Sequence, residues 1–570
     1  MARKFRDIFK SNPYEKRIKD IDPDEIFLDS QNLPKFDVNQ FEGRLEKPIP
    51  QSTFAIFGIA CFLIFIVFFF RSFDLQIVNG KIYFQRSQNN MLDDTVLFAN
   101  RGVISDRNGT PLAWNVTSSS TDDQAFSLRK YIDLPGLAHV LGYVKYPSKD
   151  SSGFYYKEDF SGEAGVEKYY NDTLSGTNGM KIVEVDAAGK LQSESVAEPP
   201  VDGQNLTLSI DSKLQNEMYN TISSLAQSVG FTGGAGVIMN VNTGEVLAMT
   251  SYPEYNSQIL TDGTDTAAIN QYLTNKNNPF LNRITDGLYT PGSIVKPYMS
   301  MAALTENIID PNKKILSTGS ISIPNPYNPS IPSVFNDWRP QGWIDMEQAI
   351  AVSSDVYFYE VGGGYQDQKG LGINLIKKYM NMFGLGEDLP NGFFSGETGT
   401  VPDPAWKAVN FNGQAWNIGD TYHTSIGQYG FQVTPIQMVR AVASIANNGK
   451  LMDPSILLGG NPNDFIQLNL NPANFQIVRD GMHLGTQTGG VAVGLDVDYL
   501  SLAAKTGTAE LGTQKQFVNS WVTGFFPYDN PKYAFAVIME KGPESNDLGG
   551  VYVMRQVLDW MHVNEPQYLQ

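Results

Sequence analysis

The longest apolar stretch of the chain lies near its N-terminal end. Residues 54–70 read FAIFGIACFLIFIVFFF and contain no charged side chain. Together with residues 49–53 they give enough helix to cross a bilayer, which takes about 20 residues. A buried core helix would also be apolar, and a cleaved signal peptide would begin nearer the N-terminus, behind a short basic lead. We predict an uncleaved membrane anchor over residues 49–71.

From about residue 204 the apolar positions follow the periods of a folded domain. Residues 206–211 have the alternation of a strand, and a helical period follows from 212 to 229. Two apolar runs joined by Asn-Thr-Gly-Glu, 235–241 and 246–252, predict a hairpin. The same periods predict three further helices and two further strands, at 347–360, 434–447, 550–563, 518–526 and 533–540. Strands at both ends with helices between them indicate an α+β fold, with one central antiparallel sheet, helices on its faces and a helical lobe.

The remaining segments differ in composition. Residues 1–48 are polar and rich in proline, which is typical of a flexible tail. Residues 72–203 are rich in Gly, Asn and Asp with short strand-like runs, and they indicate an extended pedestal-like module that ends at a Pro-Pro and Asp-Gly pair. We therefore predict a tail over 1–48, the anchor, a pedestal over 72–203 and a catalytic domain over 204–570.

Composition limits the classes of function. Apolar residues make up 42% and charged residues 18%, as in folded proteins, and the net charge of −18 argues against nucleic acid as a partner. The single cysteine, Cys61, lies inside the apolar stretch, so a disulfide within the chain and a cysteine-based zinc site are excluded. The four histidines lack the spacing of metal ligands. We predict no structural metal and no cofactor.

Basic residues indicate how the anchor is oriented. Close to the span they are equally numerous on its two sides, but residues 1–20 carry seven basic side chains against three acidic ones. This excess predicts a cytoplasmic N-terminus and a single-pass anchor, with the large C-terminal part outside the membrane.

Three short motifs stand in one order along the chain: Ser293-Ile-Val-Lys296, Ser353-Ser-Asp355 and Lys505-Thr-Gly507. Together they supply a serine nucleophile, a lysine to take its proton, a hydroxyl to relay protons and a second cation for a carboxylate. That set is typical of serine acyl-transferases of the penicillin-recognising type.

Pro291 and Gly292 precede the nucleophile and suit a turn that enters a helix, where Ser293 and Lys296 would share one face. Lysine can take the proton only if its neutral form is favoured, for example by burial beside another cation such as Lys505. The motif alone is weak, because Ser127-Leu-Arg-Lys130 repeats it without a preceding turn or following partners.

The other two motifs also have simpler interpretations. Ser353 could pass a proton between the lysine and the leaving group, yet a pair of capping serines with an acidic first turn would look the same. The motif at 505–508 predicts an edge strand in which Lys505, Thr506 and Thr508 hold a carboxylate and Gly507 leaves room for substrate backbone. The N–H groups of Ser293 and Thr508 would form an oxyanion hole. An ordinary polar strand is the alternative.

The sequence resembles the class B penicillin-binding proteins, monofunctional D,D-transpeptidases of peptidoglycan synthesis, from residue 100 to its end. The similarity is carried by four stretches around the motifs and in the pedestal: RGVISDRNGTPLAWN (101–115), GEAGVEKYYNDTLSGTNG (162–179), EVDAAGK (184–190) and NRITDGLYTPGSIVKPY (282–298). Asp355 and the run GDTYHTSIGQYGFQVTPIQM (419–438) resemble the elongation branch, the penicillin-binding proteins 2, rather than the division branch.

The resemblance implies the penicillin-binding/transpeptidase fold and its chemistry. Ser293, activated by Lys296, would attack the penultimate D-Ala carbonyl of a stem peptide and release the terminal D-Ala. An amine of a neighbouring stem would then form the cross-link. Lys505, Thr506 and Thr508 would hold the carboxylate, Ser353 and Asp355 would complete the network, and β-lactams would acylate Ser293. A SEDS-type glycosyltransferase and other elongation-machinery membrane proteins are the implied partners, in the bacterial inner membrane.

Some features depart from the family, and two rival functions stay open. The segment between Arg101 and 133–144 is shorter than usual, Tyr429 interrupts a usual Gly-Gln-Gly, and the tail is long. A D,D-carboxypeptidase or β-lactamase-type hydrolase could use the same site, although it would not need a pedestal. A β-lactam sensor or scaffold would need a larger cytoplasmic domain than 1–48.

Overall fold

A computed structural model describes residues 51–78, 92–117, 126–151, 155–185, 191–325, 328, 330–389, 392–460, 462–512 and 514–570. The predicted tail over 1–48 lies outside these residues. The chain divides into two compact units, Met1–Asp94 with Ile182–Ser195, and Thr95–Lys181 with Val196–Gln570. Strands β1 (Leu92–Leu97), β9 (Gly179–Val185) and β10 (Leu191–Glu198) cross the division and pair in the order β1-β9-β10.

The predicted anchor is a helix. Helix α1 (Gln51–Phe73) continues into a short π-helix, Asp74–Val78. Residues Ile56–Phe73 are long and apolar enough to cross a membrane, and none of their side chains is buried. A helix that exposes large apolar side chains on every face suits a lipid environment rather than a protein core.

The pedestal part of the second unit contains a small sheet and short helices. Its sheet has the order β11-β2-β3-β4, with β2 (Ile104–Ser105), β3 (Pro111–Val116), β4 (Leu128–Tyr131) and β11 (Leu206–Thr207). The same part of the chain also contains the short elements α3 (Ala138–Leu141), α4 (Gly165–Tyr169), α5 (Asn171–Ser175), β5 (Val144–Lys145), β6 (Ser148–Lys149), β7 (Tyr155–Lys157) and β8 (Ser161–Gly162). The strand predicted at 206–211 is shorter than expected: β11 ends at Thr207, Leu208 forms an isolated bridge with Leu457, and Asp211 caps the next helix.

A buried ion cluster joins two of the pedestal's sequence stretches. The Glu167 carboxylate accepts from Arg101 Nε at 2.5 Å and from Arg129 Nε at 2.8 Å, and all three side chains are fully buried. Tyr131 donates its hydroxyl to the same carboxylate. Because removing one partner from such a cluster leaves an uncompensated charge, these residues hold the 101–115 and 162–179 stretches together.

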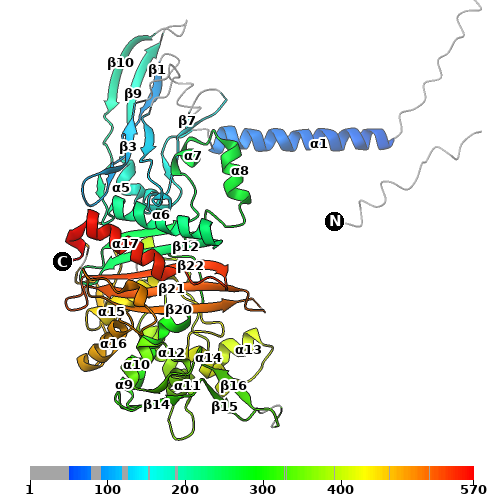
Figure 1. Ribbon diagram of the computed structural model, residues 1–570. Helices are drawn as coiled ribbons and strands as arrows, with labels where there is room; N and C mark the ends of the chain where they lie inside the picture. The colour runs from blue at the N-terminus through cyan, green and yellow to red at the C-terminus, as the bar shows by residue number, and fades with distance from the viewer. Residues whose placement is uncertain are drawn as a thin grey trace, which may run out of the picture. The chain divides into compact units, whose positions relative to one another are not determined.

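The catalytic domain is built on the predicted antiparallel sheet. Its strand order is β13-β12-β22-β21-β20, with β12 (Gly233–Asn240), β13 (Val246–Tyr252), β20 (Ala503–Leu511), β21 (Phe517–Phe526) and β22 (Tyr533–Pro543). Helices α6 (Ser212–Val229) and α17 (Gly550–Asn564) cover one face, and α15 (Pro435–Ala446) covers the other (Figure 1). Apolar side chains fill both interfaces, so the sheet lies between two hydrophobic cores.

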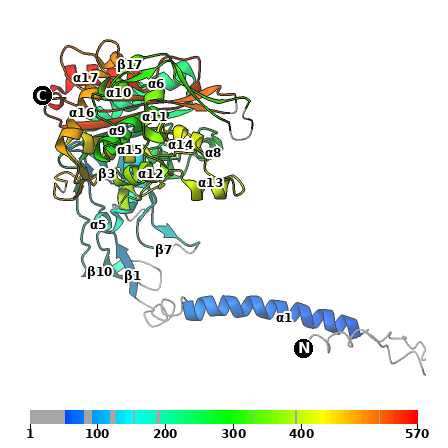
Figure 2. The ribbon, with the colours of Figure 1, turned by 90° about the horizontal axis from the view of Figure 1, so that it is seen from below.

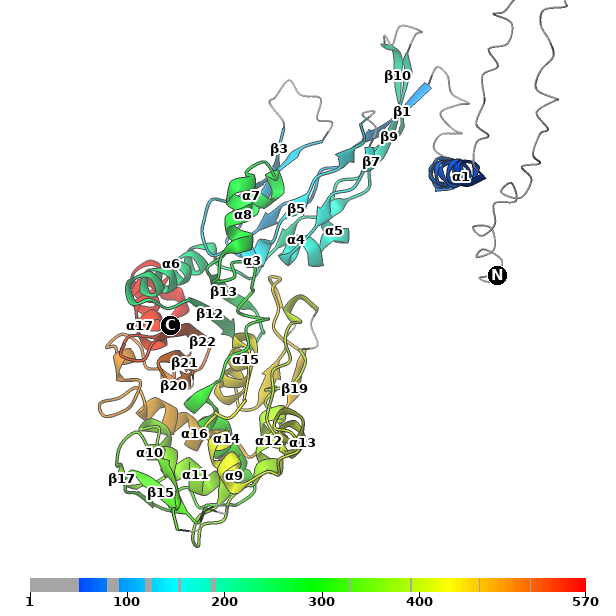
Figure 3. The ribbon, with the colours of Figure 1, turned by 90° about the vertical axis from the view of Figure 1, so that its right-hand side faces the viewer.

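The predicted helical lobe lies next to the sheet edge formed by β20. Figure 2 and Figure 3 show helices α9, α10, α11 and α16 gathered together. The elements of the lobe are the 3₁₀ turn Gly292–Val295, α9 (Lys296–Thr305), α10 (Met346–Ala351), α11 (Asp355–Gly363), α12 (Ile373–Met382), α13 (Pro404–Asn410), α14 (Ile418–Ser425) and α16 (Pro472–Leu484). Between α9 and α10 run two strand pairs, β14 (Ile315–Ser317) with β17 (Gly342–Ile344) and β15 (Ser320–Ile323) with β16 (Ser333–Asn336). Helices α7 (Ser257–Asp262) and α8 (Thr266–Thr274) precede the lobe, and β18 (Lys450–Met452) and β19 (Phe465–Gln467) follow α15.

The single helix predicted at 347–360 is wrong. The structure has two helices, α10 and α11, separated by Ser353 with φ +58°. Asp345 starts α10 through a capping box, and Ser354 caps α11 by accepting from the N–H of Tyr357. A left-handed residue ends a helix, and the capping serine begins the next one in a new direction.

Candidate active site

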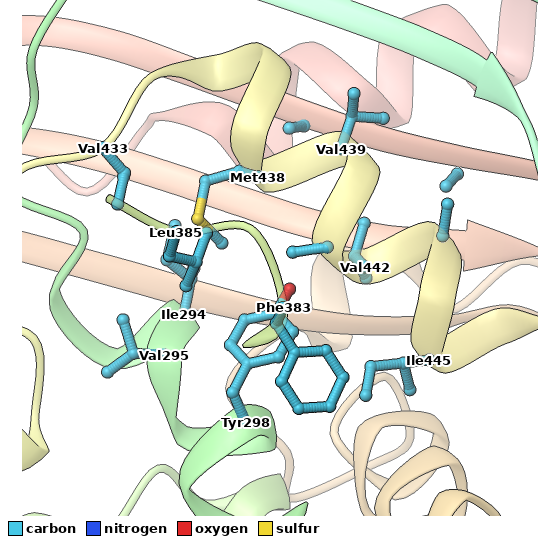
Figure 4. Packing of buried hydrophobic residues seen from close by; sticks show 14 of the residues in the cluster. Ile294, Val295, Tyr298, Phe383, Leu385, Val433, Met438, Val439, Val442 and Ile445 are labelled. Atoms are coloured by element: carbon cyan, nitrogen blue, oxygen red, sulfur yellow. The ribbon is translucent and has the colours of Figure 1, made fainter. Parts of the chain in front are cut away.

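Packing against α15 positions the turn that carries Ser293. Ile294, Val295 and Tyr298 point into the core beside α15, and Tyr298 contacts Phe383 with ring centroids 5.1 Å apart (Figure 4). Ser293 is half-buried between fully buried neighbours. The turn is 3₁₀ rather than α-helical up to Val295, and in a 3₁₀ turn residues three apart eclipse each other. Ser293 and Lys296 thus share one face, as predicted.

The Lys296 ammonium group binds the second motif. Nζ donates to Asp355 Oδ1 at 2.6 Å, to the Ser353 carbonyl at 2.8 Å and to Ser353 Oγ at 3.2 Å. Its side chain is fully buried, so these contacts replace water as its hydrogen-bond partners. Asp355 thus forms an ion pair with Lys296 inside the buried site.

The residues of the Ser353-Ser354-Asp355 motif divide between helix capping and contact with Lys296. Ser354 is the capping serine, and its hydroxyl also donates to Asp337 Oδ2 at 2.6 Å. Ser353 and Asp355 both reach Lys296. The structure therefore brings two of the three motif residues to the lysine and uses the third to start α11.

Strand β20 is an edge strand, as predicted, and places Lys505 beside this cluster. The Lys505 side chain is buried, and its Nζ donates to the Thr506 carbonyl at 2.9 Å. Burial, and next the positive charge of Lys296, hold the pKa of Lys505 well below its usual value, while Asp355 partly opposes this. Burial beside a second cation, which the sequence led us to expect for Lys296, is thus observed with a lowered pKa at Lys505.

Gly507 allows the strand to touch the nucleophile turn. A Cβ there would lie 2.6 Å from the Pro291 carbonyl oxygen and 3.0 Å from Ile294 Cγ2. The absent side chain therefore makes room for the protein's own turn. Thr506 is half-buried and Thr508 exposed, on the strand face opposite Lys505 and Gly507. A carboxylate contact by these two threonines would have to be made at the open edge of the sheet.

A second glycine supports the turn from another side. The Gly292 N–H donates to the Gly427 carbonyl at 3.0 Å, and a Cβ on Gly427 would lie only 2.2 Å from the Gly292 oxygen. Tyr429, which interrupts the usual glycine pattern, has φ +63°, and its ring stacks on Phe411 with centroids 5.7 Å apart. Aromatic packing offsets the cost of the left-handed backbone at this tyrosine.

The second Ser-x-x-Lys copy does not form a site. Lys130 lies on β4 and is exposed, while Ser127 just before the strand donates to Asn100. Residues three apart on an extended chain point to opposite sides, so serine and lysine cannot meet there. Within the described ranges there is also no group of three or more His, Cys, Asp or Glu side chains that could hold a metal ion.

Comparison with known proteins decides the family. Residues 234–556 match the model of the penicillin binding protein transpeptidase domain, which covers more than half of the chain, and residues 124–208 match the penicillin-binding protein dimerisation domain. The chain is a class B penicillin-binding protein. Its family performs D-Ala-D-Ala transpeptidation on peptidoglycan.

Relatives of this penicillin-binding protein match it over most of their length. Peptidoglycan D,D-transpeptidase MrdA of Salmonella typhimurium is 29% identical, covering 92% of this chain and 97% of the relative. MrdA of Haemophilus influenzae is 31% identical, covering 77% and 70%. The structure of Helicobacter pylori PBP2 in complex with MreC is 28% identical with a TM-score of 0.67, covering 84% of this chain and all of that one.

Sequence reasoning missed residues that complete the site of this penicillin-binding protein. Asp337 binds the second motif from a loop 16 residues upstream of Ser353, and Gly427 supports the nucleophile turn from more than 130 residues downstream. No spacing links these positions to the motifs. For Gly427, the Ile-Gly-Gln pattern was a signal, but the sequence did not indicate what it contacts.

Proposed function

We propose that this protein cross-links peptidoglycan through an acyl-enzyme on Ser293. The observation that carries the proposal is the set of hydrogen bonds from Lys296 Nζ to Ser353 and Asp355. Lys296 follows Ser293 by one 3₁₀ turn, and its charge acts on the buried Lys505. Ser293 attacks the penultimate D-Ala carbonyl of the donor stem, and the C–N bond to the terminal D-Ala breaks. The acceptor amine then attacks the ester and restores the Ser293 hydroxyl.

The donor's carboxylate prepares the base. A negative charge near Lys505 favours its protonated form, and we propose that this proton comes from Lys296 through the Ser353 hydroxyl. Lys296 is then neutral and takes the proton of Ser293 as the serine attacks. Lys296 then passes that proton through the Ser353 hydroxyl to the leaving D-Ala amine. Lys505, with Thr506 and Thr508, stays bound to the carboxylate throughout.

The backbone supports the tetrahedral intermediate. We propose that the N–H groups of Ser293 and Thr508 donate to the developing oxyanion. Removing one of these donors would lower the catalytic rate constant by a factor of about 10² to 10³. The close approach of β20 to the turn at Gly507 supports this proposal.

The setting follows from the domain order that we propose: a cytoplasmic tail over 1–48, an anchor over 49–71, a pedestal over 72–203 and the transpeptidase domain over 204–570. The catalytic domain then lies outside the inner membrane, where peptidoglycan is found. A SEDS-type glycosyltransferase would supply glycan strands. The complex of the Helicobacter pylori relative with MreC supports a role of this protein in cell elongation. Depletion of this protein should then produce round cells rather than filaments.

A fluorescent penicillin tests the acyl-enzyme. The wild-type protein in detergent should acquire stable label, and Ser293→Ala should acquire none, because only the serine oxygen can form the ester. Ser127→Ala, at the second copy of the motif, is the matched control and should label normally. Label that persists in Ser293→Ala would contradict the proposal. Rapid loss of label from the wild type would point to a hydrolase. A transpeptidase is distinguished by the cross-linked stem-peptide dimers that it forms when it is incubated with glycan that carries stem peptides.

A further inference from the structure

The loop after β16 contacts the backbone on both sides of Ser353. Asp337 and Trp338 follow β16 directly. Trp338 Nε1 donates to the carbonyl of Val352, which precedes Ser353, at 3.1 Å. Asp337 accepts from the hydroxyl of Ser354, which follows it. Two neighbouring residues thus hold the turn before and after its functional serine.

Asp337 serves four donors with one buried carboxylate. Oδ2 accepts from Ser354 Oγ at 2.6 Å, from the Val356 N–H at 3.1 Å and from Ser317 Oγ at 3.1 Å. Oδ1 accepts from the N–H of Trp338 at 2.9 Å. Hydrogen bonds to a charged acceptor are the stronger kind, and a buried carboxylate so surrounded holds its donors in fixed positions.

Trp338 contributes a contact rather than burial. The residue is 53% exposed, and the Arg339 guanidinium lies 4.2 Å from its ring centroid. An exposed tryptophan adds little to the core, so its indole N–H bond to Val352 is its main link to the catalytic lobe. Removing that N–H tests the contact without opening a cavity.

The turn needs such support because Ser353 is strained. Its φ of +58° lies in the left-handed region, which is unfavourable for a residue other than glycine. In this conformation both its carbonyl and its hydroxyl face Lys296. Residues in sparsely populated conformations persist where their surroundings over-determine them, and they cluster at functional sites.

We propose that Asp337 and Trp338 are positioning residues that hold Ser353 in its left-handed conformation. They thereby keep the Lys296 ammonium group, which binds Ser353, in position to act on Ser293. The proposal rests on the acyl-enzyme function above. Neither residue touches the reacting atoms. Trp338 acts through the Val352 carbonyl, and Asp337 acts through the Ser354 hydroxyl and the Val356 N–H.

Acylation kinetics of Trp338→Phe test the proposal. Stopped-flow labelling with a fluorescent penicillin separates the binding constant, the acylation rate constant at saturation and the amplitude, which reports the competent fraction. Loss of one hydrogen bond should lower the rate constant about three- to ten-fold, with binding constant, amplitude and thermal midpoint unchanged. Trp343→Phe is the matched control, since Trp343 is 64% exposed on β17, and it should behave as wild type.

Asp337→Asn gives a second, independent reading. It keeps the size of the side chain but lacks the charge that four donors share, so the rate constant should fall further, about 10- to 100-fold. Rate constants equal to wild type in both variants would overturn the proposal. So would losses confined to amplitude and thermal midpoint, which a purely structural role predicts. A wild-type protein that takes no label would instead refute the acyl-enzyme function itself.

Discussion

At the scale of single residues, the site depends on two buried lysines in different electrostatic surroundings. Lys296 has an anion, Asp355, at 2.6 Å. Lys505 donates to a neutral carbonyl, and the charge of Lys296 acts against its own. A carboxylate bound near Lys505 would oppose the lowering of its pKa by burial and by Lys296.

Lys505 predicts how carboxylate binding depends on pH. Its pKa is lowered in the folded protein, so it is charged below that pKa and neutral above it. A carboxylate ligand needs the charged form. Affinity should therefore fall about 10- to 100-fold as pH rises through the lowered pKa, since a charge-assisted hydrogen bond contributes roughly 1.5–3 kcal/mol.

Non-covalent binding of benzylpenicillin to Ser293→Ala, measured by calorimetry from pH 6 to 10, checks this. A variant that carries both Ser293→Ala and Lys505→Met should bind benzylpenicillin weakly, and its affinity should change much less with pH. An unchanged affinity across the range in Ser293→Ala alone would contradict the assignment of Lys505 to the carboxylate.

At the scale of elements, contact between backbones decides where the nucleophile turn lies. Strand β20 approaches it at Gly507, and the loop after α14 approaches it at Gly427. In both places a Cβ would meet atoms of the turn at less than 3.0 Å. The apolar packing of Tyr298 beside α15 then holds the turn against these surfaces (Figure 4).

Replacing Gly427 should separate this contact from general stability. Gly427→Ala places a Cβ 2.2 Å from the Gly292 oxygen, so the turn must shift, and the acylation rate constant should fall at least about ten-fold. Overpacking should also lower the free energy of unfolding by about 1–3 kcal/mol.

Gly263→Ala is the matched control. Gly263 also has a positive φ, +65°, but a Cβ there meets nothing within 4 Å. It should lose about 1 kcal/mol of stability and label at the wild-type rate. Equal labelling rates for the two variants would show that the turn does not depend on this contact.

At the scale of the whole molecule, hydrogen bonds join the pedestal part of the second unit to the catalytic domain. The Glu254 carboxylate accepts from the N–H groups of Gly136 at 2.6 Å and Ala138 at 3.0 Å, and Tyr255 donates to the Ala138 carbonyl at 3.0 Å. Burial raises the pKa of Glu254 to about 7, although the two N–H groups oppose the shift. The junction therefore contains a carboxyl group that changes charge near neutral pH.

Glu254 predicts how the stability of this junction depends on pH. Its folded pKa of about 7 exceeds the ordinary 4.5, so its stabilising contribution is complete below about 4.5 and is lost as pH rises through about 7. At about 1.36 kcal/mol per pKa unit the loss is at most about 3 kcal/mol.

Thermal unfolding of the wild type and Glu254→Gln at pH 5 and pH 8 measures this. From pH 5 to pH 8 the midpoint temperature of unfolding should fall further in the wild type than in the variant, because glutamine does not titrate. A parallel decline in both proteins would show that Glu254 is not the group responsible.

The sequence by itself determined most of the elements and led to the proposal of the reacting groups. The bounds of α6 matched their prediction, the antiparallel sheet and the edge position of β20 were confirmed, and the three motifs named Ser293, Lys296 and Lys505. Such features are local, because a helical period, a turn before a serine or an alternating strand depends on neighbouring residues.

The tertiary structure alone decided how those groups are held. The break at Ser353, the clamp of Asp337 and Trp338, the backbone contacts of Gly427 and Gly507 and the Glu254 junction each join segments distant in sequence. No periodic pattern encodes them, because a hydrogen bond or a close approach between distant segments exists only after the sheet and lobe have packed. The motifs name the chemical groups, and packing sets the distances at which they can react.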